Sequence, residues 1–101
     1  MSQPPFTEAP SSRVLRQWWV LVGKLQALYP NCPVPELRIT DTGPAVTTDD
    51  EAWQIRVNIQ SHVDVRLALR TGLTHLVFRH LRGKTGSPRN PLYREIYSAL
   101  E

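Results

Sequence analysis

The sequence predicts an α+β fold, in which a small two- or three-stranded antiparallel sheet is packed on one side by an N-terminal helix, a long central helix and a short C-terminal helix. Hydrophobic residues recur at helical spacing over residues 11–28 and 61–83, whereas over residues 52–60 they alternate as in a strand. The 101 residues, 41% of them hydrophobic, suffice for one small core and not for two. We therefore expect a single domain over residues 11–101, preceded by a disordered, proline-containing tail over residues 1–10.

Composition narrows the classes of protein to which the chain can belong. Cys32 is the only cysteine, which excludes an intrachain disulfide and a cysteine-based zinc site. No segment approaches the roughly 18 apolar residues that a membrane span needs, and the first residues lack the pattern of a signal peptide. We expect a soluble, cytoplasmic protein that does not contact a membrane. The formal net charge is +3, and residues 62–101 form the cationic half.

The first helix is expected to be capped by Ser11 or Ser12 and to end near Leu28, where a segment with three prolines follows. Helical spacing predicts that one stripe of this helix faces the core. The stripe comprises Val14, Trp18, Leu21, Val22, Leu25 and Leu28.

Three further apolar residues of this helix, Leu15, Trp19 and Val20, lie outside the core-facing stripe. One interpretation is a helix that is buried on two sides. The other is a surface for a protein partner centred on Trp19, because aromatic residues are frequent among interface hot spots. The same surface also allows a homodimer.

Strands are predicted over residues 36–40 and 52–60, with a brief third strand around residues 45–47. The strand over 52–60 has the clearest alternation, and its inward residues are Trp53, Ile55, Val57 and Ile59. The connections contain the acidic residues Asp41, Asp49, Asp50 and Glu51. Their spacing does not match a calcium-binding loop, so we expect a solvated hairpin.

The central helix is expected to start at Ser61, with Asp64 completing a capping box, and to stop at Gly83. A helical projection places one stripe toward the core, formed by Val65, Leu69, Leu73, Leu76 and His80 and flanked by Val77. The residues on the other side are Ala68, Thr71, His75, Phe78 and Arg82.

The three histidines do not predict a metal site. His75 and His80 are five residues apart, so they point roughly 140° away from each other on a regular helix and cannot share one ion. We interpret His80 as a histidine at the edge of the core and His62 as a solvated residue of the first turn. No cofactor-binding loop is visible either.

Thr74 to Arg82, THLVFRHLR, resembles the second half of the helix motif, approximately HEYLHLxFRxHPxG, of a bacterial group of compact HExxH zinc metallopeptidases. The resemblance covers roughly residues 52–101. It implies a zincin-like scaffold in which Glu95 occupies the place of a third ligand or of an acidic residue beside the ligands.

The catalytic half of that motif is not retained. Aligning His75 with the second histidine of the motif places Thr71 at the first zinc ligand and Gly72 at the catalytic glutamate. A zincin needs two imidazoles four residues apart and an adjacent carboxylate that takes a proton from the bound water. The resemblance therefore implies a scaffold without peptidase chemistry, and we expect a protein that is not an enzyme.

The chain ends in a polar turn and a short helix that Asn90 can cap, with Pro91 at its first position. The residues of this helix that are expected to pack inward are Leu92, Ile96, Ala99 and Leu100. Around the turn lies a basic cluster formed by Arg79, Arg82, Lys84, Arg89 and Arg94. Such a cluster can contact phosphates or an acidic protein.

The sequence thus favours a non-catalytic protein–protein interaction module, a small bacterial regulator or inhibitor that acts by occupying another protein's surface. The residues expected to bind the partner are Leu15, Trp19, His75, Arg79 and Arg82, and neither a cofactor nor a metal is expected. Two alternatives remain, which are nucleic-acid binding through the basic cluster and a zincin-like metallopeptidase.

Overall fold

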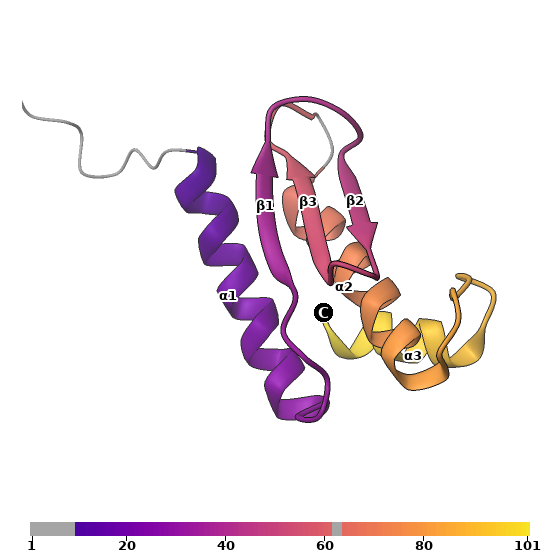
Figure 1. Cartoon of the computed structure of the whole chain (residues 1–101). Coiled ribbons are helices and arrows are strands. Elements are labelled where there is room, and N and C mark those ends of the chain that lie inside the picture. Colours follow the sequence, from indigo (N-terminus) through magenta and orange to yellow (C-terminus); the bar gives the residue numbers. More distant parts are fainter. Residues whose placement is uncertain (1–9, 62–63) are drawn as a thin grey trace, which may run out of the picture.

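The computed structural model describes residues 10–61 and 64–101 and has the expected α+β class (Figure 1). Its elements in chain order are α1 (Pro10–Leu28), β1 (Glu36–Thr40), β2 (Val46–Asp49), β3 (Gln54–Asn58), α2 (Val65–Arg82) and α3 (Pro91–Ala99). Apart from Pro10, which begins α1, the expected tail lies outside the described residues, and so does His62.

The three strands form one mixed sheet in the order β1-β3-β2. β1 and β3 run parallel, whereas β2 pairs antiparallel with β3. The expectation of a purely antiparallel sheet is therefore wrong. After the connection over residues 41–45, β2 does not pair with β1 but forms the opposite edge of the sheet. β3 then lies between the two and pairs with both.

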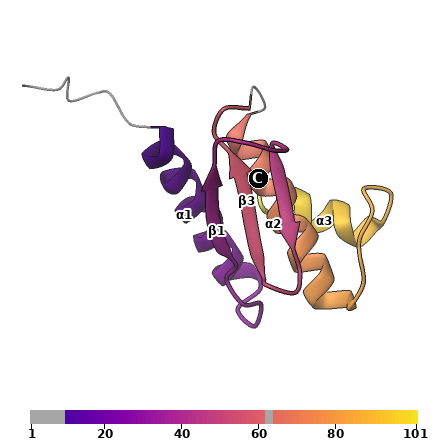
Figure 2. The ribbon, with the colours of Figure 1, turned by 45° about the horizontal axis from the view of Figure 1, so that its top comes forward.

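Helix α2 covers one face of the sheet, and the other face is open in both views (Figure 1, Figure 2). Gly72 lets the helix approach closely, because a Cβ atom there would lie 3.1 Å from Val46 and 3.2 Å from Ile55. Arg38 and Arg56, which are partners in the β1–β3 register, are exposed on the open face. The sheet is thus covered by helices on a single side.

β3 is shorter than the strand expected over residues 52–60, because Trp53 adopts a left-handed backbone conformation (φ 56°) just before it. The Trp53 indole donates a hydrogen bond to the carbonyl of Pro33 (2.8 Å). The Trp53 carbonyl accepts a hydrogen bond from the backbone N–H of Glu36 (3.0 Å). These two bonds hold a conformation that non-glycine residues seldom adopt.

Within β3, Ile55 and Val57 are buried as expected, but Asn58 is buried too, although the alternation predicted that it faces water. Its side-chain amide donates to the carbonyl of Gly43 (2.7 Å) and its amide oxygen accepts from the N–H of Gln60 (2.8 Å). Burial of a polar group is tolerated when its hydrogen bonds are made, as they are here.

β2 lies one residue later and extends two residues further than the brief strand expected around residues 45–47. The acidic segment after it is a hairpin turn, as predicted. One carboxylate oxygen of Asp49 accepts hydrogen bonds from the backbone N–H groups of Glu51 and Ala52, both at 3.0 Å. This is the local side-chain-to-backbone bonding that favours aspartate in turns.

Helix α1 begins at Pro10, so Ser11 and Ser12 lie inside the helix and the expected serine cap is wrong. Proline suits a first turn because its missing N–H would have no acceptor within the helix. The core-facing stripe is buried at Val14, Trp18, Leu21, Val22 and Leu25. Leu28, expected in the same stripe, is 48% exposed because α1 ends there and the chain turns away.

Asp64 is itself the cap of α2, because its carboxylate accepts hydrogen bonds from the N–H groups of Arg66 (2.8 Å) and Leu67 (3.3 Å). The helix therefore begins later than expected, and the capping box starting at Ser61 is wrong. Gly83 ends the helix in the left-handed conformation (φ 70°), as predicted.

Helix α2 is buried on more sides than its pattern predicted. Leu69, Leu73, Leu76 and Val77 are buried as expected. Ala68 and Phe78, which were placed on the opposite side, are buried as well, and the Phe78 ring is covered by Tyr93 of α3. His80, placed on the buried stripe, is instead exposed near the end of the helix.

Helix α3 begins as the sequence predicted, with Asn90 as its cap and Pro91 at its first position. Ile96 and Leu100 are buried as expected. Tyr93 is buried too, which the sequence did not indicate, and its ring centroid lies 6.2 Å from that of Phe78. The chain between α2 and α3 folds over these two rings.

Gly86→Ala is expected to lower the free energy of unfolding by about 1–3 kcal/mol through overpacking. A Cβ atom at Gly86 would lie 2.7 Å from Phe78 and 2.8 Å from Tyr93, so both rings must shift. Urea unfolding followed by circular dichroism measures the loss. Lys84→Ala in the same connection is the matched control, with a change within about 0.5 kcal/mol. Equal stability of the two variants would contradict the close packing of Gly86.

Candidate functional site

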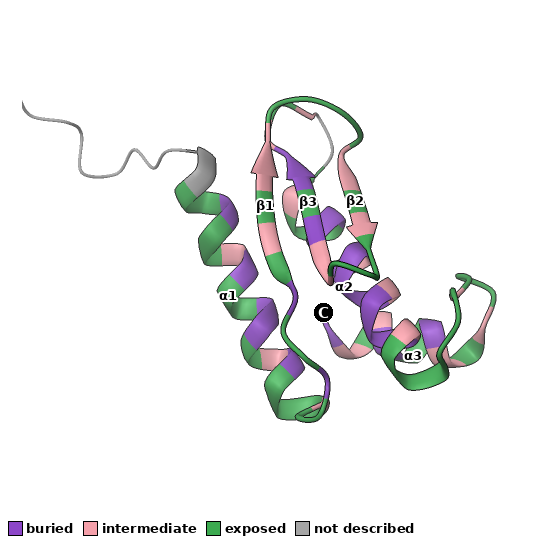
Figure 3. Cartoon of the chain, viewed as in Figure 1, coloured by how far each residue is buried: buried purple, intermediate pink, exposed green. Residues whose placement is uncertain are grey.

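The first candidate site is the outer side of α1, where three large apolar side chains are exposed. Trp19 is 65% exposed, Val20 53% and Leu15 43%. Figure 3 shows exposed segments recurring along α1 between buried ones. We refer to these three residues as the α1 surface. Their exposure shows that α1 is buried on one side only, so the interpretation of a helix buried on two sides is wrong.

The second candidate site is a polar pocket of about 210 Å³ between β2 and α2, which we call the His75 pocket. It is lined by Thr48, Asp50, His75, Leu76, Arg79 and Thr85. The Arg79 guanidinium lies 3.1 Å from the Asp50 carboxylate, and both groups are partly exposed. The pocket therefore offers one charge of each sign beside an imidazole.

His75 contacts Tyr93 of α3, with 3.0 Å between its Nε2 atom and the phenol oxygen and 5.0 Å between the ring centroids. Burial lowers the pKa of His75, so the imidazole is neutral at neutral pH. Burial, followed by the charge of Tyr97, raises the pKa of Tyr93. The phenol thus keeps its proton and can donate a hydrogen bond to Nε2 when that nitrogen is unprotonated.

The two histidines of α2 face different neighbours, as the helical projection predicted. His80 makes an edge contact with the Trp53 ring, at 6.4 Å between centroids, while His75 contacts Tyr93. Over residues 10–61 and 64–101, no three or more histidine, cysteine or acidic side chains are grouped so that they could hold a metal ion.

The residues at the positions of the metallopeptidase motif's first zinc ligand and catalytic glutamate, Thr71 and Gly72, do not form a catalytic site. Gly72 is packed against the sheet, so that position has no room for a glutamate. Thr71 lines a largely apolar pocket beside α3, of about 350 Å³. Glu95 is exposed, and its charge adds to burial in raising the pKa of Tyr29. The carboxylate of Glu95 thus interacts electrostatically with the phenol of Tyr29.

The structure does not bring the five expected partner-binding residues into one surface. Leu15 and Trp19 lie on α1, which runs beside β1, whereas the Asp50 contact places Arg79 and His75 near the end of β2 (Figure 1). β1 and β2 are the two outer strands of the sheet. Arg82 is exposed at the last turn of α2. The residues predicted to form one partner-binding surface therefore belong to two separate sites, an apolar one on α1 and a polar one on α2.

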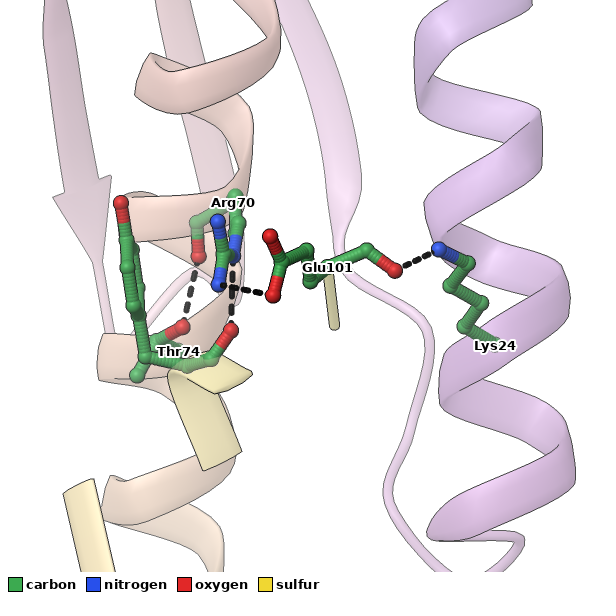
Figure 4. A network of polar contacts seen from close by, with 5 residues as sticks. Lys24, Arg70, Thr74 and Glu101 are labelled. Atoms are coloured by element: carbon green, nitrogen blue, oxygen red, sulfur yellow. Dashed lines mark hydrogen bonds and ion pairs between the residues drawn. The ribbon is translucent and has the colours of Figure 1, made fainter. Parts of the chain in front are cut away.

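Arg70 is a buried arginine that the sequence analysis missed (Figure 4). Its Nε atom donates a hydrogen bond to the carbonyl of Tyr97 (2.6 Å), and the guanidinium lies 3.7 Å from the centroid of the Tyr97 ring. Its Nη2 atom is 3.9 Å from the Glu101 carboxylate. Lys24 of α1 donates a hydrogen bond to the Glu101 carbonyl. No sequence motif signals such a network.

No family model matches the chain, and no significant match is found among curated proteins or solved structures. The resemblance to compact zinc metallopeptidases thus stays a prediction. None of the described helices is long and apolar enough to cross a membrane. The functional argument therefore rests on the geometry of the α1 surface and the His75 pocket.

Acidification from pH 7.5 to 5 is expected to destabilise the wild-type protein more than the His75→Gln variant. The pKa of His75 in the folded state lies below the unfolded value of 6.5, so the unfolded chain binds the proton first as the pH falls. The contribution of neutral His75 is therefore complete above pH 6.5 and is lost as the pH falls toward the folded pKa.

Urea unfolding at the two pH values measures this difference. His80→Gln, a change at the exposed histidine of the same helix, is the matched control and should keep the wild-type loss of stability. If His75→Gln shows the full wild-type loss, the buried neutral imidazole is not its source.

Proposed function

We propose that the protein is a non-catalytic interaction module, a small bacterial regulator or inhibitor that acts by binding a partner protein through the α1 surface. The observation that carries the proposal is the exposure of Trp19, at 65%, beside two other exposed apolar side chains. Contiguous apolar patches on a protein surface mark interaction sites, and tryptophan is enriched among the residues that dominate binding energy.

The charge around the α1 surface supports binding to a protein. Arg13, Arg16 and Lys24 are the charged residues of α1, and the helix contains no acidic residue. An apolar centre with a charged rim is the usual anatomy of a protein interface, in which the rim gives selectivity and the centre gives affinity.

The chemistry of the remaining reactive groups supports a role without catalysis. Burial raises the pKa of Cys32 to about 11, so its thiol stays protonated and is a poor nucleophile at neutral pH. The Nε2 atom of His75 is engaged by Tyr93. Arg79 is engaged by Asp50, and the His75 pocket offers a separate, polar contact near the other edge of the sheet.

Trp19→Ala is expected to weaken partner binding about 30-fold or more, as the loss of a hot-spot residue does. Leu28→Ala is the matched control, because Leu28 is also an exposed apolar residue of α1 and lies outside the α1 surface. Partners retained by the wild-type protein from its host are identified by mass spectrometry, and the affinity of the purified pair is then measured for each variant.

Arg79→Glu combined with Arg82→Glu tests the polar site in the same assay and is expected to slow association through lost charge steering. Circular dichroism should be unchanged in all variants, since these side chains are exposed or partly exposed. Binding that tolerates Trp19→Ala as well as Leu28→Ala would rule out the α1 surface.

A second candidate function is nucleic-acid binding through the basic cluster around the turn between α2 and α3. Four basic side chains of this cluster, Arg82, Lys84, Arg89 and Arg94, are exposed. Within the described parts of the chain none of the four forms an ion pair, whereas Arg79 is neutralised by Asp50. These four charges are thus available to phosphates.

If these four residues each contact a phosphate, the logarithm of the affinity for duplex DNA should fall with the logarithm of salt concentration with a slope of roughly −3.6. Alanine at both Arg82 and Arg89 should reduce the steepness of that slope by about 2. Fluorescence anisotropy with labelled DNA over a salt series measures both values. Undetectable binding at low salt would exclude this second function.

A further inference from the structure

We infer that the partner of the α1 surface is a second copy of this chain, bound antiparallel so that the two α1 helices pack across a two-fold axis near residue 21. The inference rests on the proposed binding role of the α1 surface and names its partner. Three properties of α1 support it, namely the order of large and small residues along its outer side, the space around Gly23 and the distribution of charge.

Large and small residues follow one another along the outer side of α1. Leu15, Trp19, Gly23 and Ala27 are spaced four residues apart, so they form one ridge of the helix, and all four are exposed. The first two are large and the last two are small. In an antiparallel pair centred at residue 21, Trp19 of each copy lies level with Gly23 of the other and Leu15 lies level with Ala27. Each large side chain thus meets a small one.

The space around Gly23 makes this fit possible. A Cβ atom added at Gly23 would have no heavy atom within 4 Å apart from its own turn of the helix, so no other part of residues 10–61 and 64–101 fills the space in front of it. The Trp19 side chain, by contrast, extends into solvent from the preceding turn. In a dimer with two-fold symmetry, Trp19 of each copy contacts Gly23 of the other. The two contacts are identical, as an isologous interface requires.

Charge decides the orientation of the two helices. Arg13 and Arg16 lie in the N-terminal half of α1, and α1 has no acidic residue in its first turn and no basic residue in its last. A parallel pair would place the arginines of both copies side by side. An antiparallel pair places them beside the C-terminal turn of the other helix, whose carbonyl groups carry partial negative charge. Of the two orientations, the antiparallel one therefore keeps the N-terminal arginines of the two copies apart.

The test measures the oligomeric state of the full chain by sedimentation equilibrium over a concentration series. The wild-type protein is expected to be a dimer. Trp19→Ala and Gly23→Leu are each expected to raise the dimer dissociation constant about 30-fold or more, the first by removing the large residue and the second by filling the space it occupies. The Cβ atom of Gly23→Leu would have open space within the described part of the chain, and circular dichroism of the variant checks that the monomer stays folded. Leu28→Ala is the matched control and should leave the dimer intact.

The orientation is measured with a spin label on Ser12→Cys in a Cys32→Ala background. Residue 12 is nine residues from the axis, so the labelled positions of an antiparallel dimer are separated by about 27 Å along the helices. A parallel pair would bring them within about 10 Å. A short label distance, or a dimer that tolerates both Trp19→Ala and Gly23→Leu, would overturn the inference.

Failure of the inference can be told apart from failure of the proposed function. A wild-type monomer that still binds a different protein through Trp19 overturns the second copy as partner and leaves the interaction module standing. A monomer with no binding that depends on Trp19 removes both.

Discussion

The contact between Arg70 and the end of the chain holds the three helices in place. Arg70 of α2 bonds to the Tyr97 carbonyl of α3 and stacks on its ring, and it faces the Glu101 carboxylate. Glu101 in turn accepts a hydrogen bond from Lys24 of α1. A buried arginine is costly unless its donors are bonded, and here the cost is met by backbone, ring and carboxylate together. The position of α1, and with it the α1 surface, depends mainly on the buried apolar stripe of the helix, and the exposed contact between Lys24 and Glu101 adds to it.

Local features were largely predictable because they depend on residues close in sequence. The spacing of Val14, Leu21 and Leu25 predicted which side of α1 is buried, and Asn90 with Pro91 predicted the start of α3. Such signals are read from one element at a time. The predicted caps of α1 and α2 were wrong. At each helix start, several residues that can begin or cap a helix lie within a few positions of each other, and the sequence pattern does not distinguish between them.

Features that depend on distant residues were not predictable. The parallel pairing of β1 with β3 requires knowing that β2 passes to the outside of the sheet. The left-handed Trp53 is stabilised by Pro33 and Glu36, about twenty residues earlier. The burial of Arg70 could not be predicted from the helical pattern, because its hydrogen-bond partner Tyr97 is 27 positions away. For the candidate site, the pattern placed Trp19 outside the core-facing stripe but left open whether a second side of α1 is buried, and the separation of Trp19 from Arg79 followed only from the sheet order.

The arrangement of α1 makes its outer side well suited to binding. Trp18 and Leu21 fix the inner side of the helix in the core, and Lys24 ties it to Glu101. The adjacent Trp19 therefore projects from a backbone that is already ordered, so little conformational entropy remains to be lost when it is covered. Because the His75 pocket lies near the other outer strand of the sheet, covering α1 leaves Arg79 and Asp50 accessible. A chain of this size can thus engage a large apolar contact at one edge of its sheet and a polar one at the other, without either contact excluding the other.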